Sequence, residues 1–393
     1  MKVGLVTPGF SASEADWCIP ALLDLVRCLS TRAEVHVFPL RYPYQTRPYD
    51  VYAARVHPLG GGTLRGPRRA ALLGRAVGAI GREHRRAPFD LLHAFWADES
   101  GLVAVVCARG LGIPAIVSLA GGELVGFPDI DYGGQLHWSS RLMTGLALRG
   151  AARVTVGSTY LRRLAAPRLP AERLAHLPLG VDPDLFHPNG DRDDPPFDPT
   201  RVNVLHVASL VPVKAQADLL DAFARAARVE PRLALHVVGD GPLRPILVTR
   251  ARVLGIAEDV TFHGAMAHER LPAYYRAADL AALTSRHEAQ GLVALEAAAC
   301  GCTTVGTAVG ILPDLGTAAR AVLPGDIVGL AREIAALATD SDLRRELGAA
   351  SVRTVRRDYT LERTVDALER LYRDVPTGRG CGERDNEPAS PAR

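Results

Sequence analysis

The sequence lacks any hydrophobic run that approaches the ~20 residues needed to cross a membrane, although hydrophobic residues make up 48% of its 393 positions. This absence argues against a membrane-spanning helix. The chain begins directly with an apolar, strand-like stretch, residues 1–7, which leaves no room for a signal peptide. We therefore expect a globular, cytoplasmic protein, and the length is typical of two domains.

The sequence also lacks a cysteine framework and a strong net charge. Its six cysteines match no metal-binding or disulfide spacing, which predicts free, buried thiols. They are Cys18, Cys28, Cys107, Cys300, Cys302 and Cys381. The net charge is only +3 and no motif of basic and aromatic residues is present, which argues against a nucleic-acid partner. The basic excess lies within residues 1–180 and would suit an anionic acceptor or a membrane surface.

Short apolar runs typical of strands alternate with longer helical runs along the whole chain. In the first half the strands are expected at 3–7, 35–39, 91–94, 115–119 and 154–156, and helices at 17–30, 102–111 and 137–149. In the second half the strands are expected at 203–208, 234–238, 260–263, 280–283 and 303–306. Helices there are expected at 216–228, 242–254, 327–338, 343–355 and 361–373. The alternation predicts parallel sheets covered by helices on both faces.

A stretch rich in proline and polar residues separates the two halves. We place the first domain at 1–182, a linker at 183–200 and the second domain at 201–358. The last residues, 376–393, have the composition of a disordered tail. The predicted fold class is therefore α/β, with two doubly wound, Rossmann-like domains, and the natural ligand site is the cleft between them.

Two acidic residues, Glu288 and Glu296, stand on either side of Gly291, where a helix is expected to begin. The free N–H groups at a helix start bind phosphate, so the segment suits a nucleotide-sugar, which has hydroxyls at both ends and phosphates between. If the whole segment were helical, the two Cα atoms would be roughly 12 Å apart, whereas a retaining glycosidase needs its carboxyl groups about 5 Å apart. The alternative is an ordinary helix residue and a helix cap.

Several loops that follow strands contain further candidates. Lys214 lies before a helix and could supply a positive charge to a phosphate, although a solvated lysine is the alternative. Gly239 and Gly241 would let the backbone approach a ligand closely, and a tight turn would explain them equally well. Gly9, after the first strand, could bring its amide to a diphosphate or a sugar.

The ordered series of these motifs resembles the large glycosyltransferase family 4, a retaining family with the GT-B fold. The similar segments are 207–214, 238–243, 260–264, 274–279, 285–297 and 309–315, and more loosely 90–94 and 178–186. The resemblance covers roughly residues 1–375. It implies a final helix, 359–375, that crosses back to the first domain.

The resemblance implies a role for each matching residue. Glu288 would bind a hydroxyl of the donor sugar, Glu296 the ribose, and Lys214 the departing diphosphate. The amides near Gly291, Leu292 and Val293 would bind the diphosphate. Contacts to the rest of the donor are expected from Gly9, Ser209, Gly239, Gly241, Gly264 and Met266, with the last two near the base. No metal and no other cofactor is expected.

The chain departs from the family pattern in its donor and acceptor regions. Ser209 stands where the family usually has an arginine, so that a phosphate contact is missing or comes from elsewhere, for example from Arg286. Ala120 stands where a histidine is common, and Gly310-Ile311 replaces a pair of glycines. These changes would mark a subfamily with a different pocket, or a relative with weakened activity.

The resemblance implies transfer of a hexosyl group from a UDP- or GDP-sugar to a hydroxyl acceptor, which is left open among a glycan, a lipid and a small molecule. The alternatives are a non-catalytic sugar or nucleotide binder and a nucleotide-sugar 2-epimerase. Candidates for acceptor binding are the polar residues Glu123, Asp129, Asp131 and Tyr132.

The stretch 68–86 is predicted to form a basic helix. Its arginines Arg68, Arg75, Arg82, Arg85 and Arg86 are expected on one side, and Leu73, Val77 and Ile80 on the other. Such a helix could dock on the inner membrane face, and an ordinary surface helix has the same pattern.

Overall fold

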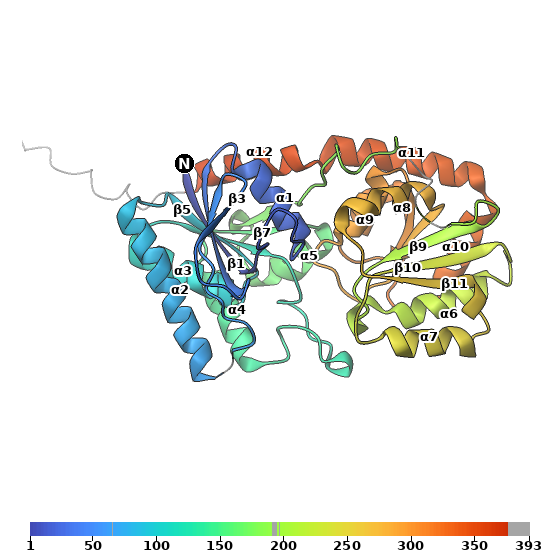
Figure 1. Cartoon of the computed structure of the whole chain (residues 1–393), viewed down its shortest axis with the longest axis horizontal. Coiled ribbons are helices and arrows are strands. Elements are labelled where there is room, and N and C mark those ends of the chain that lie inside the picture. The colour runs from blue at the N-terminus through green and yellow to red at the C-terminus, as the bar shows by residue number, and fades with distance from the viewer. Residues whose placement is uncertain (65, 191–194, 196, 376–393) are drawn as a thin grey trace, which may run out of the picture.

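The computed structural model describes residues 1–64, 66–190, 195 and 197–375. Two sheets, each covered by helices, lie side by side. The long helices α11 (Ser341–Asp358) and α12 (Leu361–Asp374) run along one edge of both (Figure 1). The prediction of two α/β halves with mainly parallel sheets is confirmed.

The first sheet has the strand order β3-β4-β2-β1-β5-β6-β7-β8. Neighbouring strands run parallel, except that β3 runs antiparallel to β4. The strands are β1 (Lys2–Gly9), β2 (Glu34–Tyr42), β3 (Tyr49–Val51), β4 (Ala54–Val56), β5 (Leu91–Phe95), β6 (Ala115–Leu119), β7 (Arg153–Val156) and β8 (Leu174–His176). Every residue of β5 and β6 is buried, as expected for central strands with helices on both faces.

The helices of this half are α1 (Pro20–Leu29), α2 (Pro67–Arg86), α3 (Glu99–Leu111), α4 (Trp138–Gly150) and α5 (Thr159–Ala165). Two of them begin at a side-chain cap, because Asp98 accepts from the backbone of α3 and Ser158 from that of α5. No helix among the described residues combines the length and apolar character that a membrane crossing requires.

The second sheet is parallel throughout and has the order β11-β10-β9-β12-β13-β14. Its strands are β9 (Val202–Val207), β10 (Leu233–Val238), β11 (Val260–Gly264), β12 (Leu280–Leu283), β13 (Thr303–Thr307) and β14 (Ala319–Val322). The helices are α6 (Gln216–Ala226), α7 (Arg244–Val253), α8 (Leu271–Ala277), α9 (Leu292–Ala299) and α10 (Ile327–Thr339). This is the 3-2-1-4-5-6 order of a Rossmann fold. Successive strands are added on one side of β9 up to β11 and on its other side from β12 onward, so the order reverses between β9 and β12.

The final helix returns to the first half of the chain, as the resemblance implied. The buried residues Val365, Leu368 and Tyr372 of α12 belong to the same core cluster as residues of β1 and α1. The Tyr372 hydroxyl lies 2.7 Å from Nδ1 of His93, a fully buried residue on β5. Burial lowers the pKa of His93 to about 3, so its ring is neutral.

Several short elements were not predicted from the sequence, namely β3, β4, β8, β14, α5 and α8. They have three to seven residues, too few for a hydrophobic period to be recognised. The described cysteines are free as predicted, but Cys18 is exposed and Cys28 only half-buried, so the prediction of buried thiols was wrong for these two. Cys381, the predicted tail and part of the predicted linker lie outside the described residues.

Candidate active site

Lys214 and Glu288 come together where the strand order of the second sheet reverses. Lys214 follows β9 in the short turn Pro212–Lys214, and Glu288 follows β12. The carboxyl ends of two parallel strands that diverge at such a point leave a crevice for a ligand. The sequence placed both residues after strands, and the strand order explains why they meet.

The two side chains form an ion pair at the crevice. Lys214 Nζ lies 2.5 Å from Glu288 Oε1, which also accepts a hydrogen bond of 2.6 Å from Ser285 Oγ. Both side chains are mostly buried, with 24% of Lys214 and 11% of Glu288 exposed. Lys214 is one of only two lysines among the 46 basic residues, so a compact ammonium group stands here in a chain whose other cations are almost all arginines.

The backbone around this pair is tied to the neighbouring strand ends. The Thr284 hydroxyl donates to the Lys214 carbonyl oxygen at 3.0 Å, and Ala215 adopts a left-handed conformation with φ of 49° directly after the lysine. Gly310 follows β13, with φ of 58°, and a Cβ there would lie only 2.7 Å from the Cβ of Glu288. A side chain at 310 would therefore displace the loop that carries Glu288.

The helix predicted between the two glutamates is present. Gly291, with φ of 81°, precedes α9, whose first turn begins at Leu292. The first N–H groups of a helix have no partner within the helix, and this helix start borders the same space as Lys214 and Glu288. A helix start of this kind can bind phosphate, and the phosphate contact at α9 stays a prediction.

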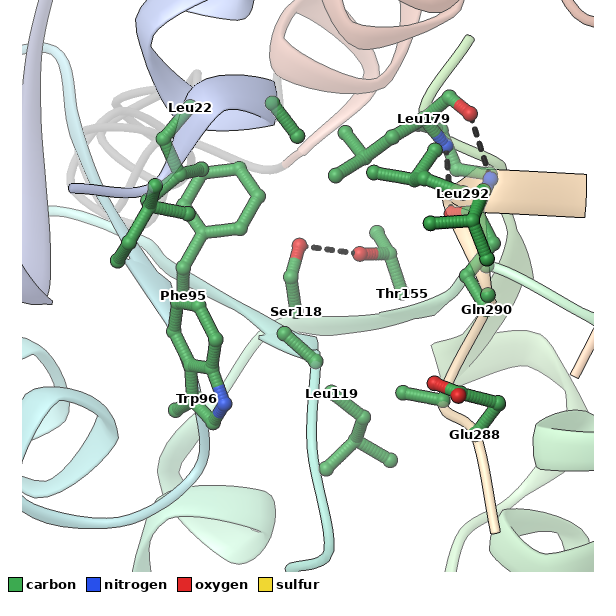
Figure 2. Close-up of a pocket in the computed structure, with 18 of the residues that line it drawn as sticks. Leu22, Phe95, Trp96, Ser118, Leu119, Thr155, Leu179, Glu288, Gln290 and Leu292 are labelled. Carbon is green, nitrogen blue, oxygen red and sulfur yellow. Dashed lines mark hydrogen bonds between the residues drawn. The ribbon is translucent and has the colours of Figure 1, made fainter. Parts of the chain in front are cut away.

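A cavity of about 250 Å³ lies between the two halves of the molecule (Figure 2). Of the predicted residues, Lys214, Glu288, Gly291, Leu292 and Val293 line it. The wall from the first half is mainly apolar, with Ile19, Leu22, Phe95, Trp96, Leu119, Leu177 and Leu179, and polar groups come from Ser118 and Thr155.

Ser118 and Thr155 belong to a buried chain of hydrogen bonds. Their hydroxyl oxygens lie 2.5 Å apart, and Ser118 Oγ is also 2.8 Å from Nε2 of His93. The other ring nitrogen of His93 faces Tyr372 of α12. The polar patch on the cavity wall is therefore oriented by the C-terminal helix.

Several direct contacts hold the loop after β12 against the first half. The Gln290 amide makes two hydrogen bonds with the backbone of Leu179, at 2.5 and 2.9 Å (Figure 2). The Ser158 hydroxyl donates to the carbonyl oxygen of Ala289 at 2.7 Å. His287 Nε2 lies 3.0 Å from the carbonyl oxygen of Gly121, and since a carbonyl only accepts, this nitrogen carries the ring proton.

Arg286 does not line the cavity, and its suggested role in place of the family arginine missing at Ser209 stays a prediction. Its guanidinium pairs with Asp129 of the first half and lies 4.8 Å from the centre of the Phe127 ring. Ser209 itself is exposed and does not line the cavity. A phosphate contact from Arg286 would require this pair to open.

The other predicted donor residues lie outside the cavity. Gly239 and Gly241 have positive φ, and a Cβ on either would lie 2.0 or 2.6 Å from the carbonyl oxygen of Ala208 or Leu210. Their glycine requirement therefore comes from the fold itself. Gly264 pairs with Gly239 through the backbone, Met266 is half-buried, and Gly9 is packed against Cys18 and Tyr42. Their donor roles stay predictions.

Glu296 is buried and its carboxylate has protein partners. Oε1 lies 3.0 Å from His268 Nε2, and Oε2 accepts a 2.9 Å hydrogen bond from the Tyr275 hydroxyl. Burial opposes protonation of His268, but the hydrogen bond and the charge of Glu296 outweigh it, so that the pKa of His268 is raised. The predicted ribose contact has to share this carboxylate with two side chains.

The predicted acceptor residues do not line the cavity. Glu123 is buried and accepts hydrogen bonds from the backbone N–H groups of Ala97, Ala120 and Gly121, so it organises the loop after β6. Asp129 is taken by its arginine partner, and Asp131 is exposed. Tyr132 lies near His287, with ring centres 6.2 Å apart. The sequence favoured these residues only because they are polar and follow a strand.

The basic helix is present as α2, but its core-facing side was predicted incorrectly in part. Leu72, Ala76 and Ile80 are buried, at a spacing of four residues, whereas the predicted Val77 is exposed. The membrane contact stays a prediction.

Trp96, Ser118, Thr155 and Gln290 are cavity residues that the sequence reasoning missed. Trp96 directly follows β5 and has a φ of 71°, which is rare for a bulky residue and clusters at functional sites. Ser118 and Thr155 lie near the carboxyl ends of β6 and β7. That position was the available signal, since ligands bind there in such sheets.

Two Rossmann-like halves that face each other across a cavity define the GT-B class of fold. Comparison with known families agrees. The family model described as "Glycosyl transferases group 1" matches residues 189–353, and the one described as "Glycosyl transferase 4-like domain" matches residues 19–180. The chain therefore contains a group 1 glycosyltransferase domain in its second half and a glycosyltransferase 4-like domain in its first half.

Relatives with curated names include the D-inositol 3-phosphate glycosyltransferase of Segniliparus rotundus. It is 36% identical over 222 residues, which are 53% of this chain and 48% of that protein. The GDP-mannose-dependent alpha-(1-6)-phosphatidylinositol monomannoside mannosyltransferase of Mycolicibacterium smegmatis is 35% identical over 205 residues, 47% of this chain and 52% of that protein. The chain thus spans about half the length of these relatives.

Solved structures share the fold over almost the whole chain. Sucrose-phosphate synthase from Thermosynechococcus elongatus has a TM-score of 0.80 at 22% identity, with 95% of this chain and 98% of that one covered. Anabaena HepE in complex with UDP-glucose has a TM-score of 0.70 at 19% identity, with 94% and 99% covered. At these identities the likeness concerns the fold alone.

Proposed function

We propose that this protein transfers a hexosyl group from a nucleotide-sugar to a hydroxyl acceptor, with retention of the anomeric configuration. The observation that carries the proposal is the Lys214–Glu288 pair beside the start of α9, all on the wall of one cavity. The donor diphosphate would lie at the helix start, with Lys214 close to the phosphate that leaves. The GDP-mannose-dependent relative and the HepE structure in complex with UDP-glucose support this class of donor.

In the proposed reaction the bond between the anomeric carbon and the diphosphate breaks, and negative charge grows on the departing oxygen. A fixed cation and helix N–H groups in a largely buried site stabilise such charge effectively. Lys214 would therefore act on the leaving group without a metal ion. Glu288 would orient Lys214 through Oε1 and accept a sugar hydroxyl through its other oxygen.

The acceptor would enter from the first half. Because this wall is formed mainly by Phe95, Trp96 and Leu119, with only the Ser118 and Thr155 hydroxyls as polar groups, we propose an acceptor whose hydroxyl is attached to an apolar or flat part. This differs from the polar acceptor site that Glu123, Asp129 and Asp131 would have formed.

The function is tested first by thermal shift with UDP, GDP, ADP and dTDP, since a ligand that binds the folded state raises its melting temperature. Nucleotide-sugars that carry the base of the bound nucleotide are then assayed for transfer to a panel of acceptors. NMR gives the anomeric configuration of the product. Tight binding with neither transfer nor slow hydrolysis of any sugar would refute the enzyme. Conversion of the donor without an acceptor would indicate an epimerase.

Amine labelling gives an independent test of the donor position. The chain has only Lys2 and Lys214, and Lys2 belongs to β1 and pairs with Glu34. Reductive methylation followed by peptide mass spectrometry should show protection of Lys214 by the bound nucleotide and no change at Lys2. Equal labelling of Lys214 with and without a saturating nucleotide would place the diphosphate elsewhere.

A further inference from the structure

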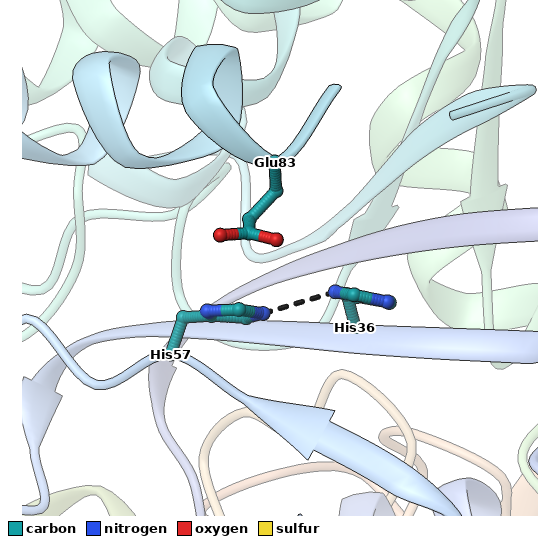
Figure 3. Close-up of side chains that lie close together, drawn as sticks. All are labelled: His36, His57 and Glu83. Carbon is teal, nitrogen blue, oxygen red and sulfur yellow. Dashed lines mark hydrogen bonds between the residues drawn. The ribbon is translucent and has the colours of Figure 1, made fainter. Parts of the chain in front are cut away.

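A group of metal-ligating side chains lies in the first half, away from the cavity. His36 is the third residue of β2, His57 directly follows β4, and Glu83 belongs to α2. One ligand atom from each lies within 4.8 Å of the others (Figure 3). Within the described parts of the chain, no other set of three or more such residues has this geometry.

The two imidazole rings already face each other through nitrogen atoms. His36 Nδ1 lies 2.9 Å from His57 Nε2, and the Glu83 carboxylate points toward the pair from α2 (Figure 3). Two nitrogens bound to one tetrahedral ion at 2.0–2.1 Å would be about 3.4 Å apart. In the ion-free pair His57 Nε2 donates to His36 Nδ1, so binding requires the His57 proton to move to Nδ1 of its own ring and the two rings to separate by a few tenths of an ångström.

The tautomer of His36 is fixed by a carboxylate on its far side. Nε2 of His36 lies 3.1 Å from Glu34 Oε1, and Glu34 is itself paired with Lys2 at 3.0 Å. Since a carboxylate accepts, the ring proton is on Nε2 and the lone pair of Nδ1 points to His57. Metal-binding histidines are usually oriented in this way, by a carboxylate on the nitrogen opposite the metal.

The chemistry of the three side chains matches one class of ion. Glu83 Oε1 accepts from Arg86 at 2.7 Å, which leaves its second oxygen for an ion. Two imidazoles and one carboxylate suit zinc and similar first-row ions, and calcium and magnesium prefer all-oxygen sites.

We propose that His36, His57 and Glu83 bind one zinc-class divalent cation. The ion would connect β2, the end of the short β3–β4 pair at the edge of the sheet, and α2. Without the ion, these segments are held together by side-chain packing and by the short strands β3 and β4, which have three residues each. His36 lies near the amino end of its strand, whereas the cavity lies at the carboxyl ends, so the ion would stabilise the fold and take no part in sugar transfer.

The test is calorimetric titration of the EDTA-treated, tag-free full chain with zinc chloride, and absorption spectroscopy with cobalt(II). We expect one ion per chain, a rise in melting temperature with zinc, and a cobalt spectrum of nitrogen and oxygen ligation. His57→Ala and Glu83→Ala should each weaken binding at least about tenfold, since even partners behind the ligands contribute 10–100-fold. His137→Ala changes an exposed histidine before α4 and is the matched control.

Absence of stoichiometric zinc binding, or equal binding by all three variants and the unmodified chain, would overturn the proposal. His57 stacks on Phe38, with ring centres 4.8 Å apart, so its variant could lose stability for another reason. Glu83→Ala replaces a half-buried helix residue with a good helix former. If His57→Ala is unstable, zinc binding by Glu83→Ala alone tests the proposal. Donor binding and transfer should be the same with and without zinc, which separates this site from the proposed function.

Discussion

Replacing Lys214 by alanine tests the centre of the proposed mechanism. The change leaves Glu288 with the hydrogen bond from Ser285 as its remaining described partner, on a side chain only 11% exposed. Losing a hydrogen bond between charged groups costs about 1.5–3 kcal/mol. We therefore expect the free energy of unfolding to fall by about 1–3 kcal/mol, which a domain with an ordinary stability of about 5–15 kcal/mol survives.

The effect on activity should be larger than the effect on stability. Removal of one fixed donor from a developing negative charge costs about 10²–10³ in kcat, or about 2.7–4 kcal/mol. The same loss should appear in kcat and in kcat/KM, because the interaction is made mainly in the transition state. Urea denaturation gives the stability, and steady-state kinetics with the donor found by thermal shift gives the rates.

A double-mutant cycle with Glu288→Gln makes the reasoning refutable. Because Lys214→Ala strands a charge that Glu288→Gln removes, the double variant should be more stable than the sum of the single effects implies, by about 0.5–3 kcal/mol. Additive stabilities would show that the ion pair is not formed. A raised KM with unchanged kcat would show that Lys214 binds the donor without acting on the leaving group. Lys2→Ala, which changes the other lysine, should leave kcat unaltered.

Three further predictions concern the residues around the site. The pKa of His268 is raised beside Glu296, so the pair stabilises the folded state fully below about pH 6.5 and this contribution is lost as the pH rises through the raised pKa. In His268→Asn, urea denaturation across pH 5–9 should show a free energy of unfolding that no longer falls over this pH range. A pH profile of stability equal to that of the unmodified chain would contradict the prediction. Tyr372→Phe removes the hydroxyl partner of His93, so the free energy of unfolding should fall by about 1–3 kcal/mol with the core otherwise intact. No change in a urea titration would show that this hydrogen bond does not stabilise the docking of α12. Gly310 has a positive φ, and Gly310→Ala adds a Cβ 2.3 Å from a backbone carbonyl oxygen. The change should lower the free energy of unfolding by about 1–3 kcal/mol and reduce turnover. Activity equal to that of the unmodified chain would show that the loop with Glu288 can move away without harm.

Much of the fold could be predicted because its signals are local. Apolar runs such as β5 and β12, and the amphipathic helices between them, have periods that a short window of sequence shows. The short strands and α5 could not be found in this way. They are held by pairing with distant segments, as β8 is with β7.

The candidate site was predicted on one side of the cavity and missed on the other. Glu288, Lys214 and the start of α9 belong to an ordered series of motifs in one half of the chain. The opposite wall is formed by Phe95, Trp96 and Ser118, which are ordinary apolar and small polar residues at strand ends. Nothing in their local sequence distinguishes them from core residues.

The sequence by itself determined the two α/β halves, the helix start at Gly291 and the acidic and basic residues that border it, because each follows from composition, period and spacing along a short stretch. Only the tertiary structure decided which of them meet. The strand order brings Lys214 to Glu288, which are 74 residues apart, and the packing of Glu296 against His268 directs that carboxylate into the core. Such contacts depend on the register of distant strands, which no local pattern encodes.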